Sequence, residues 1–139
     1  MDTNRAPHRH ELTKAEAMRL MARVRLGRVV FARPSPPGAV PGRLVRPAQY
    51  CVVDGRIVFR VLANPALTKA LRRAPVAFEA DERSAEDGAG WTVRATGQAS
   101  RVASLTEAAA YERCLPPAWY EGAQMYRLDP EQVTGTVRT

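Results

Sequence analysis

Few side chains in this 139-residue sequence could carry acid–base or nucleophilic catalysis, and none of them falls in a catalytic motif. The two histidines, His8 and His10, lie in a polar N-terminal segment, so the folded part offers no Ser–His or Cys–His pair. The GxSxG, HExxH and Walker patterns are absent. No catalytic residue can therefore be named from the sequence, and chemistry on this chain would need a bound cofactor.

Cys51 and Cys114 are the only cysteines, and no CxxC pair exists. Two distant cysteines are typical of free thiols, and a metal site is not expected. No apolar run is long enough to span a bilayer, and the N-terminal residues lack the apolar stretch of a secretory signal. The sequence therefore predicts a cytoplasmic protein with no metal and no membrane partner.

The net charge of +7 comes almost entirely from arginine, since Lys14 and Lys69 are the only lysines. The arginines are spread along the chain and accompany no nucleic-acid-binding motif. A nucleic-acid partner is therefore not expected. The positive charge indicates either a solvated basic surface or a site that attracts an anionic cofactor.

The chain is long enough for one core, so residues 13–139 are expected to form a single domain behind a flexible arm of residues 1–12. Capping patterns predict helices at residues 14–26, 63–74 and 104–114, with Gly27 ending the first in a left-handed turn. Strands are predicted at residues 28–33, 45–53, 56–62, 76–81, 91–102, 124–128 and 133–137. Many short strands with few helices predict a mainly β fold, a small antiparallel barrel with covering helices.

The clearest local signal is Asp54-Gly55, which predicts a type I′ turn between two β-rich segments. A two-residue turn there pairs Val53 with Arg56 and, counting back, Gln49 with Arg60. Alternation then gives the hairpin one apolar face, expected to be core, made by Ala48, Tyr50, Val52, Ile57, Phe59 and Val61. The other face carries Gln49, Cys51, Arg56, Val58 and Arg60. This mixed face is the expected place for a ligand or a subunit interface.

Two further features concern the last strands. Gly97 lies near the middle of a long alternating strand, which indicates a bend or bulge of the kind that lets a sheet curl into a barrel. Asp129-Pro130 predicts a turn that separates the final two strands.

Several segments resemble, in order, the small members of the pyridoxamine 5′-phosphate oxidase-like, FMN-binding split-barrel family. The matching segments are residues 26–31, 46–50, 57–60, 68–69, 76–81, 90–93 with 96–97, and 133–135. The resemblance covers about residues 11–138. It implies a six-stranded antiparallel split β-barrel that forms a homodimer and holds FMN at the subunit interface.

The resemblance also implies cofactor-binding residues. Arg60 and Lys69 would bind the FMN phosphate, with Thr68 as a hydroxyl donor, an arrangement that suits a dianion. The strand Arg46, Pro47, Ala48, Gln49 and Tyr50 would run along the isoalloxazine ring and offer backbone amides. Val61 stands where family members usually have threonine, and Ala66-Leu67 where a glycine is expected. Trp91 is a further candidate contact, although core or dimer-interface packing is the favoured interpretation for it.

Two hypotheses remain open on the sequence. The first is an FMN-dependent oxidoreductase that transfers hydride at flavin N5 to or from a small-molecule substrate. The second is a non-catalytic dimeric module that binds a flavin, deazaflavin or haem, or has lost its cofactor. Deazaflavin ranks below FMN because Arg72 and Arg73, neighbours on a helix, point about 100° apart. Arg60 has an alternative interpretation as a surface arginine paired with Glu79.

Overall fold

The computed structural model describes residues 9–33, 35–40, 42–62, 64–73, 75–118 and 121–139. The chain is mainly β, with three short helices. In chain order the elements are β1 (Arg9–Glu11), α1 (Lys14–Met21), β2 (Leu26–Ala32), β3 (Arg43–Val53), β4 (Arg56–Leu62), α2 (Pro65–Arg73), β5 (Val76–Arg83), β6 (Gly90–Arg101), α3 (Leu105–Glu112) and β7 (Ala123–Arg138). Within these described ranges, no helix combines the length and the apolar character needed to cross a membrane.

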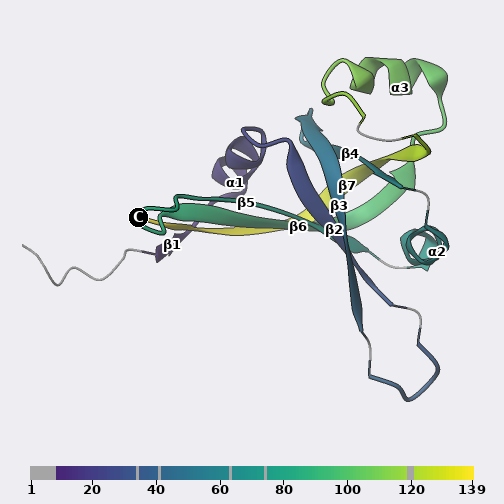
Figure 1. Ribbon diagram of the computed structural model, residues 1–139, viewed down its shortest axis with the longest axis horizontal. Helices are drawn as coiled ribbons and strands as arrows, with labels where there is room; N and C mark the ends of the chain where they lie inside the picture. The colour runs from purple at the N-terminus through teal and green to yellow at the C-terminus, as the bar shows by residue number, and fades with distance from the viewer. Residues whose placement is uncertain (1–8, 34, 41, 63, 74, 119–120) are drawn as a thin grey trace, which may run out of the picture.

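Six strands close into an antiparallel barrel. They run in the order β7-β4-β3-β2-β5-β6, and β6 pairs back onto β7 along its whole length. The short β1 adds to the edge of β7. The helices lie at separate places around the barrel, and the far end of the β2–β3 hairpin projects beyond it (Figure 1). The predicted six-stranded antiparallel barrel is thus confirmed.

The β3–β4 hairpin has the predicted register. Asp54 and Gly55 both have positive φ, 50° and 76°, as a type I′ turn requires. Val53 pairs with Arg56 and Gln49 with Arg60. On the predicted core face, five of the six side chains are buried and Val52 is partly buried against the core. Local turn chemistry therefore fixed which side of both strands faces inward.

Aromatic side chains fill the centre of the barrel. The ring of Phe78 on β5 lies 4.9 Å from that of Tyr50 and 5.3 Å from that of Phe59. The Tyr50 hydroxyl donates a hydrogen bond of 2.6 Å to the Met21 carbonyl at the end of α1, which ties this helix to the sheet. A buried hydroxyl needs such a partner, and the carbonyls at a helix end are available to supply it.

The first helix ends earlier than predicted. α1 stops at Met21, and Leu26 and Gly27 belong to β2, where they pair with Gln49 and Ala48. Gly27 is needed for close packing rather than for a left-handed turn. A Cβ atom there would lie 2.6 Å from both the Glu79 carbonyl oxygen and the Phe78 ring. Pairing with β3 therefore outweighs the helical pattern of residues 22–26.

The predicted turn at Asp129-Pro130 is wrong, because β7 is one continuous strand of 16 residues. The β6–β7 register shifts between Thr96 and Gly97, and Gly97 pairs with Pro130 after the shift. Proline has no N–H for the ladder but is tolerated at a bulge. The bulge expected at Gly97 is confirmed, and it places Pro130 where a strand can accommodate it.

The N-terminal boundary also differs from the expectation. Of the arm assigned to residues 1–12, residues 1–8 lie outside the described part of the chain. Arg9–Glu11 form β1 and pair with Arg138–Thr136 at the end of β7. The sequence carries no β-rich signal there, and the pairing is supplied by the free edge of β7.

Candidate functional site

An open hollow of about 670 Å³ lies beside α2 and is lined by Asn64, Pro65, Thr68, Lys69 and Arg72. The helix begins here because the Asn64 side chain accepts from the amides of Ala66 and Leu67, at 2.9 and 3.2 Å, and Pro65 suits the first turn. Leu67 and Leu71 are buried and anchor the other face of α2. This packing turns Thr68, Lys69 and Arg72 outward.

The predicted pair Thr68 and Lys69 therefore lies together at this hollow. The Thr68 hydroxyl, however, donates a 3.1 Å hydrogen bond to the Asn64 carbonyl within the helix. The two first amides of α2 are also occupied by Asn64. What the hollow offers an anion is thus the positive charge of Lys69 and Arg72.

The hollow continues as a basic groove across the barrel. Lys69 also borders a second hollow of about 180 Å³ beside Arg33 and Arg73. This second hollow shares Ala32 and Pro75 with a third hollow, of about 230 Å³, on the outer face of β2, β5 and β6. We call this path the basic groove, and its cationic side chains are Arg72, Lys69, Arg73, Arg33, Arg43 and Arg94. Arg72 and Arg73 border adjoining hollows, so their divergence does not interrupt the groove.

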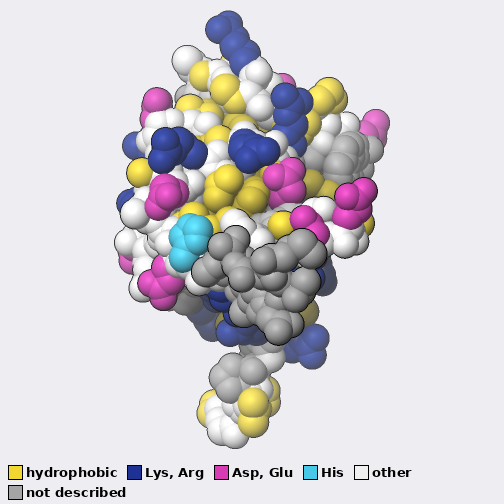
Figure 2. Space-filling view, turned by 90° about the vertical axis from the view of Figure 1, so that its left-hand side faces the viewer, with side chains coloured by type: hydrophobic (Ala, Val, Ile, Leu, Met, Phe, Trp, Pro, Cys, Tyr) yellow, Lys and Arg dark blue, Asp and Glu magenta, His cyan; other side chains and the backbone are white. Residues whose placement is uncertain are grey.

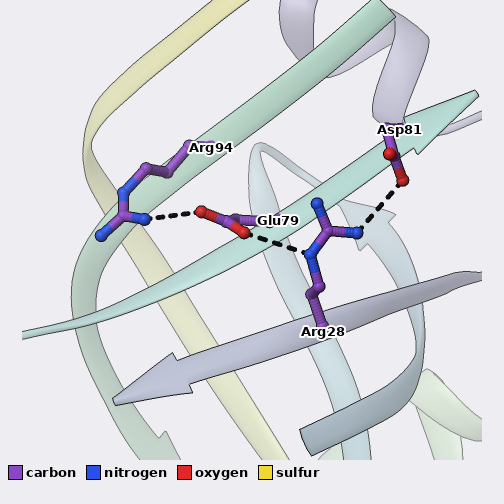
Figure 3. A network of polar contacts seen from close by, with 4 residues as sticks. All are labelled: Arg28, Glu79, Asp81 and Arg94. Carbon is purple, nitrogen blue, oxygen red and sulfur yellow. Dashed lines mark hydrogen bonds and ion pairs between the residues drawn. The ribbon is translucent and has the colours of Figure 1, made fainter. Parts of the chain in front are cut away.

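One end of the groove carries a network of ion pairs (Figure 3). Glu79 on β5 accepts from Arg28 on β2, at 3.1 Å, and from Arg94 on β6. Arg28 also reaches Asp81 at 3.1 Å. Glu79 therefore pairs with Arg28 and Arg94, and the alternative pairing of Arg60 with Glu79 is wrong. Arg28 and Arg94 are neutralised by these carboxylates, so the groove is least attractive to an anion at this end.

Another hollow, of about 360 Å³, lies between β1, β6 and β7. Its lining includes Thr92, Thr134 and Thr136, together with Glu11 and the already paired Arg94. On the face of the molecule seen in Figure 2, cationic side chains likewise lie beside acidic ones, around a central apolar patch. Among the described residues, positive charge without a carboxylate in the lining is found at the α2 hollow and at the adjoining hollow beside Arg33 and Arg73.

Arg60 lies away from the α2 hollow. It is 7% exposed and its guanidinium donates to the Pro116 carbonyl and pairs with Glu112 at 3.2 Å. Gln49 beside it is 2% exposed and donates a 2.7 Å hydrogen bond to the Pro117 carbonyl. The mixed face of the hairpin is therefore covered by α3 and by residues 113–117 of the same chain. A small second core of Val58, Tyr111 and Leu115 lies underneath.

The described structure thus brings Thr68 to Lys69 but does not bring Arg60 to either of them. Arg72 was not among the predicted site residues, and the covering of Arg60 by the α3 segment was missed as well. One signal could have found that cover: a buried arginine and glutamine need acceptors, and a proline-rich segment offers free carbonyls. The role of Arg60 in phosphate binding stays a prediction.

The strand Arg46–Tyr50 uses its amides within the barrel. The Tyr50 amide donates to the Arg25 carbonyl at 3.0 Å, and the Arg33 amide to the Gly42 carbonyl at 2.8 Å. In an antiparallel pair, every second residue of a strand directs its amide toward the same neighbouring strand. With the β2–β3 register, the amides of Arg46 and Ala48 therefore also point toward β2. Pro47 has no amide and Gln49 pairs with β4. A flavin ring beside this strand would therefore contact side chains or carbonyls rather than amides. The cofactor-binding role of the strand stays a prediction.

The remaining predicted residues point inward. Val61 is 1% exposed and belongs to the core. Trp91 is also part of the core, and its indole N–H donates to Glu82 at 3.2 Å. It borders a hollow of about 40 Å³, too small for a flavin ring. Of the favoured interpretations for Trp91, core or dimer-interface packing, core packing is confirmed.

A closed six-stranded antiparallel barrel with short covering helices is the architecture of a split barrel. Comparison with known proteins agrees. A match to the pyridoxamine 5′-phosphate oxidase family spans residues 13–137. The chain therefore belongs to this family.

Three known proteins show what this chain is similar to. The uncharacterized protein Rv0080 of Mycobacterium tuberculosis is 39% identical over 132 residues, which is 90% of this chain and 82% of that protein. The FAD-binding protein of Mycobacterium smegmatis is 27% identical, with a TM-score of 0.71 over 93% of this chain and 98% of its own. A heme-binding protein of M. smegmatis, 18% identical with a TM-score of 0.66, covers 92% of this chain and 58% of its own and shares the fold.

Proposed function

We propose that this protein binds a flavin nucleotide, with FMN ranked first, and acts as an oxidoreductase on a small-molecule substrate. The observation that carries the proposal is the charge at the α2 hollow. Lys69 and Arg72 both line it, and among the described residues neither of them forms an ion pair. Free cations beside an open hollow suit a terminal phosphate dianion.

The donor set favours a flavin over haem. Haem iron needs an axial ligand such as histidine, cysteine, methionine or tyrosine, and among the residues that the structure describes none of these lines the α2 hollow or the basic groove. A phosphate needs cations, which both supply. A bound flavin would supply hydride transfer at its N5 atom. The chain's own contribution would be to hold the phosphate with Lys69 and Arg72, while β3 would border the ring.

The basic groove supports a second candidate within the same class. Arg33, Arg73 and Arg43 lie beyond Lys69 and offer positive charge to a longer anionic cofactor. FAD, bound by the M. smegmatis relative, and a deazaflavin coenzyme both extend past the first phosphate. Parallel titration of the apo-protein with FMN, FAD and deazaflavin decides the order, and tighter binding of either longer cofactor would overturn the ranking of FMN.

A homodimer is part of the proposal. The described residues that line the α2 hollow all come from one short segment, so they form a single wall. Ligand sites normally bury most of a ligand's surface, which requires a second wall. A second copy of the chain would supply it, and the half-exposed Val45 and Leu26 offer apolar surface for the contact. Sedimentation that shows only monomer at micromolar concentration would contradict this arrangement.

The binding experiment uses the two lysines of the chain. FMN is titrated into the purified protein and followed by quenching of flavin fluorescence. We expect Lys69→Ala to weaken binding by about 10- to 100-fold, because a charge-assisted contact worth roughly 1.5–3 kcal/mol is lost. The matched control is Lys14→Ala, which removes the other lysine, an exposed residue at the start of α1. Equal affinities for the two variants would place the phosphate elsewhere.

Turnover is tested separately. The flavin-loaded protein is mixed with a hydride donor, such as a reduced nicotinamide nucleotide, and bleaching of the flavin absorbance is recorded. Bleaching followed by reoxidation with an added acceptor supports an oxidoreductase. Tight flavin binding without bleaching by any donor in a panel would favour the non-catalytic module.

A further inference from the structure

The two cysteines, far apart in the sequence, meet on the outer face of β3. Cys51 lies on this face beside the small second core of Val58, Tyr111 and Leu115. Cys114 follows α3 by two residues, and its backbone N–H donates to the Tyr111 carbonyl at 2.9 Å. The two thiols are close enough to influence one another, since burial first and the neighbouring Cys114 second raise the pKa of Cys51. Both are free thiols in the described structure.

Contacts on both sides hold Cys114 in this position. Before it, Glu112 pairs with Arg60 at 3.2 Å. After it, the Pro116 carbonyl accepts from Arg60 and the Pro117 carbonyl accepts from Gln49. Since Gln49 and Cys51 share one face of β3, the segment 112–117 runs along this face with Cys114 over Cys51. The pairing therefore follows from the packing of the whole segment rather than from one side-chain rotamer.

We propose that Cys51 and Cys114 are a modification site, at which an intramolecular disulfide fastens the segment 112–117 onto β3. The oxidant is a low-molecular-weight disulfide, for which oxidised glutathione is the probe. The Cys114 thiolate attacks it, forms a mixed disulfide and releases one glutathione. The Cys51 thiolate then attacks the Cys114 sulfur and releases the second glutathione. Two protein thiols lose two electrons and two protons, and one glutathione disulfide becomes two thiols.

The order of the two steps follows from exposure. Cys114 is exposed, whereas Cys51 is partly covered. Burial, together with a smaller effect of the neighbouring Cys114, raises the pKa of Cys51 to about 11, against the opposing effect of the Arg60 guanidinium on β4. Arg60 is itself paired with Glu112. The second step is thus limited by the small thiolate fraction of Cys51, and it should accelerate about tenfold per pH unit below that pKa.

The bond would have a clear effect on the fold. It links a β3 residue to the end of α3 and closes a long loop, which restricts the unfolded chain. It also holds covalently the cover over Arg60 and Gln49, which otherwise rests on the packing of Tyr111 and Leu115 against Val58, on hydrogen bonds and on one ion pair. The inference does not depend on flavin binding, because the site is distinct from the α2 hollow.

The test exposes the full chain to oxidised glutathione at mildly alkaline pH, with thiol counting, intact mass and peptide mapping. We expect both thiols to be lost within a monomer, with no retained glutathione, and a melting temperature raised by roughly 5–10 °C. Dithiothreitol should reverse the change. Cys51→Ser should retain one glutathione on Cys114, and Cys114→Ser should stay largely unreacted.

Two results would overturn the proposal. One is a stable mixed disulfide on the unaltered protein, because Cys51 would then be unable to reach Cys114. The other is disulfide formation between chains only, seen as a dimer on a non-reducing gel. The rate of ring closure between pH 7 and 9 supplies a second readout, and a rate independent of pH would contradict the assignment of Cys51 as the attacking thiol.

Discussion

Arg60 on β4 and Glu112 at the end of α3 form an ion pair of 3.2 Å, in which the arginine is almost fully buried and the carboxylate largely exposed. The same guanidinium donates to the Pro116 carbonyl. Arg60 is thus held inside the molecule, whereas Lys69 and Arg72 face an open hollow. This difference separates the cation that stabilises the fold from those that are free for an anion.

Arg60→Ala should mainly lower stability. The change leaves the Pro116 carbonyl without its donor and removes packing above β4, at a cost of about 1–3 kcal/mol in the free energy of unfolding. Urea denaturation measures it, with Glu112→Gln as a control that keeps the shape and loses one largely exposed partner. A stable Arg60→Ala variant with FMN affinity lowered more than in Lys69→Ala would restore Arg60 as the phosphate ligand.

Glu79→Gln should destabilise the barrel by about 1–2 kcal/mol, because one carboxylate, 21% exposed, joins arginines from two other strands. Without it, Arg28 and Arg94 face each other as like charges. The control is Asp81→Asn, since Asp81 binds only Arg28 among the described pairs and is 49% exposed. Thermal melts at low and high salt compare the two variants. Equally small losses of stability in both would show that the ion-pair network does not stabilise the barrel.

Gly97→Ala should be among the most damaging small substitutions in the chain. A Cβ atom there would lie 2.1 Å from the Asp129 carbonyl oxygen on β7, which is backbone and cannot move aside without opening the bulge. We expect a loss of about 1–3 kcal/mol or more. Gly42→Ala is the control, since its closest neighbour would be an ordinary 3.7 Å from the new Cβ. Denaturant midpoints that coincide for the two variants would refute the close approach.

Stability should fall in strongly alkaline solution because of Tyr50. Burial, with the Asp81 carboxylate adding to it, raises the pKa of this phenol above its ordinary value of 10.0. The folded state therefore keeps the proton while the unfolded chain loses it. The contribution of Tyr50 to the free energy of unfolding is complete below pH 10 and declines above it by up to about 1.4 kcal/mol per pH unit.

The comparison uses Tyr50→Phe, which loses the 2.6 Å hydrogen bond to Met21 at every pH but has no proton to lose. Its stability should fall less steeply than that of the unaltered protein between pH 10 and 11.5. The half-buried Cys51 also titrates in this range, but it is present in both proteins and cancels. Parallel stability curves in this window would contradict the assignment to Tyr50.

Local signals in the sequence were enough for the β3–β4 hairpin. Asp54-Gly55 determined the turn, the turn determined the register, and the register placed Tyr50 inside and Arg60 on the outer face. These inferences succeeded because each depends on residues close together in the chain. The many short strands and Gly97 indicated a small barrel, but its six-stranded split form could be expected only through the family resemblance, since its closure joins strands that are distant in sequence.

The errors share one physical cause, which is long-range contact. α1 ends at Met21 because Leu26 pairs with Gln49 on β3, and β7 stays continuous because Pro130 meets the bulge at Gly97. The prediction that Arg60 lies on the outer face of the hairpin is confirmed. The segment that covers it, however, lies more than fifty residues further along the chain. No local pattern around Arg60 distinguishes an arginine that awaits a ligand from one already bound to its own chain.

β7 pairs with β4 along its first half, with β6 along nearly all of its length, and with β1 at its end. It is also the last strand in chain order, so during synthesis the other five barrel strands exist before the strand that joins β4 to β6. Until β7 arrives, both of those strands have open edges that can pair with other chains. Closure by such distant contacts makes folding slow relative to a helical protein of this size. The nascent chain is therefore most prone to aggregate just before its final strand emerges.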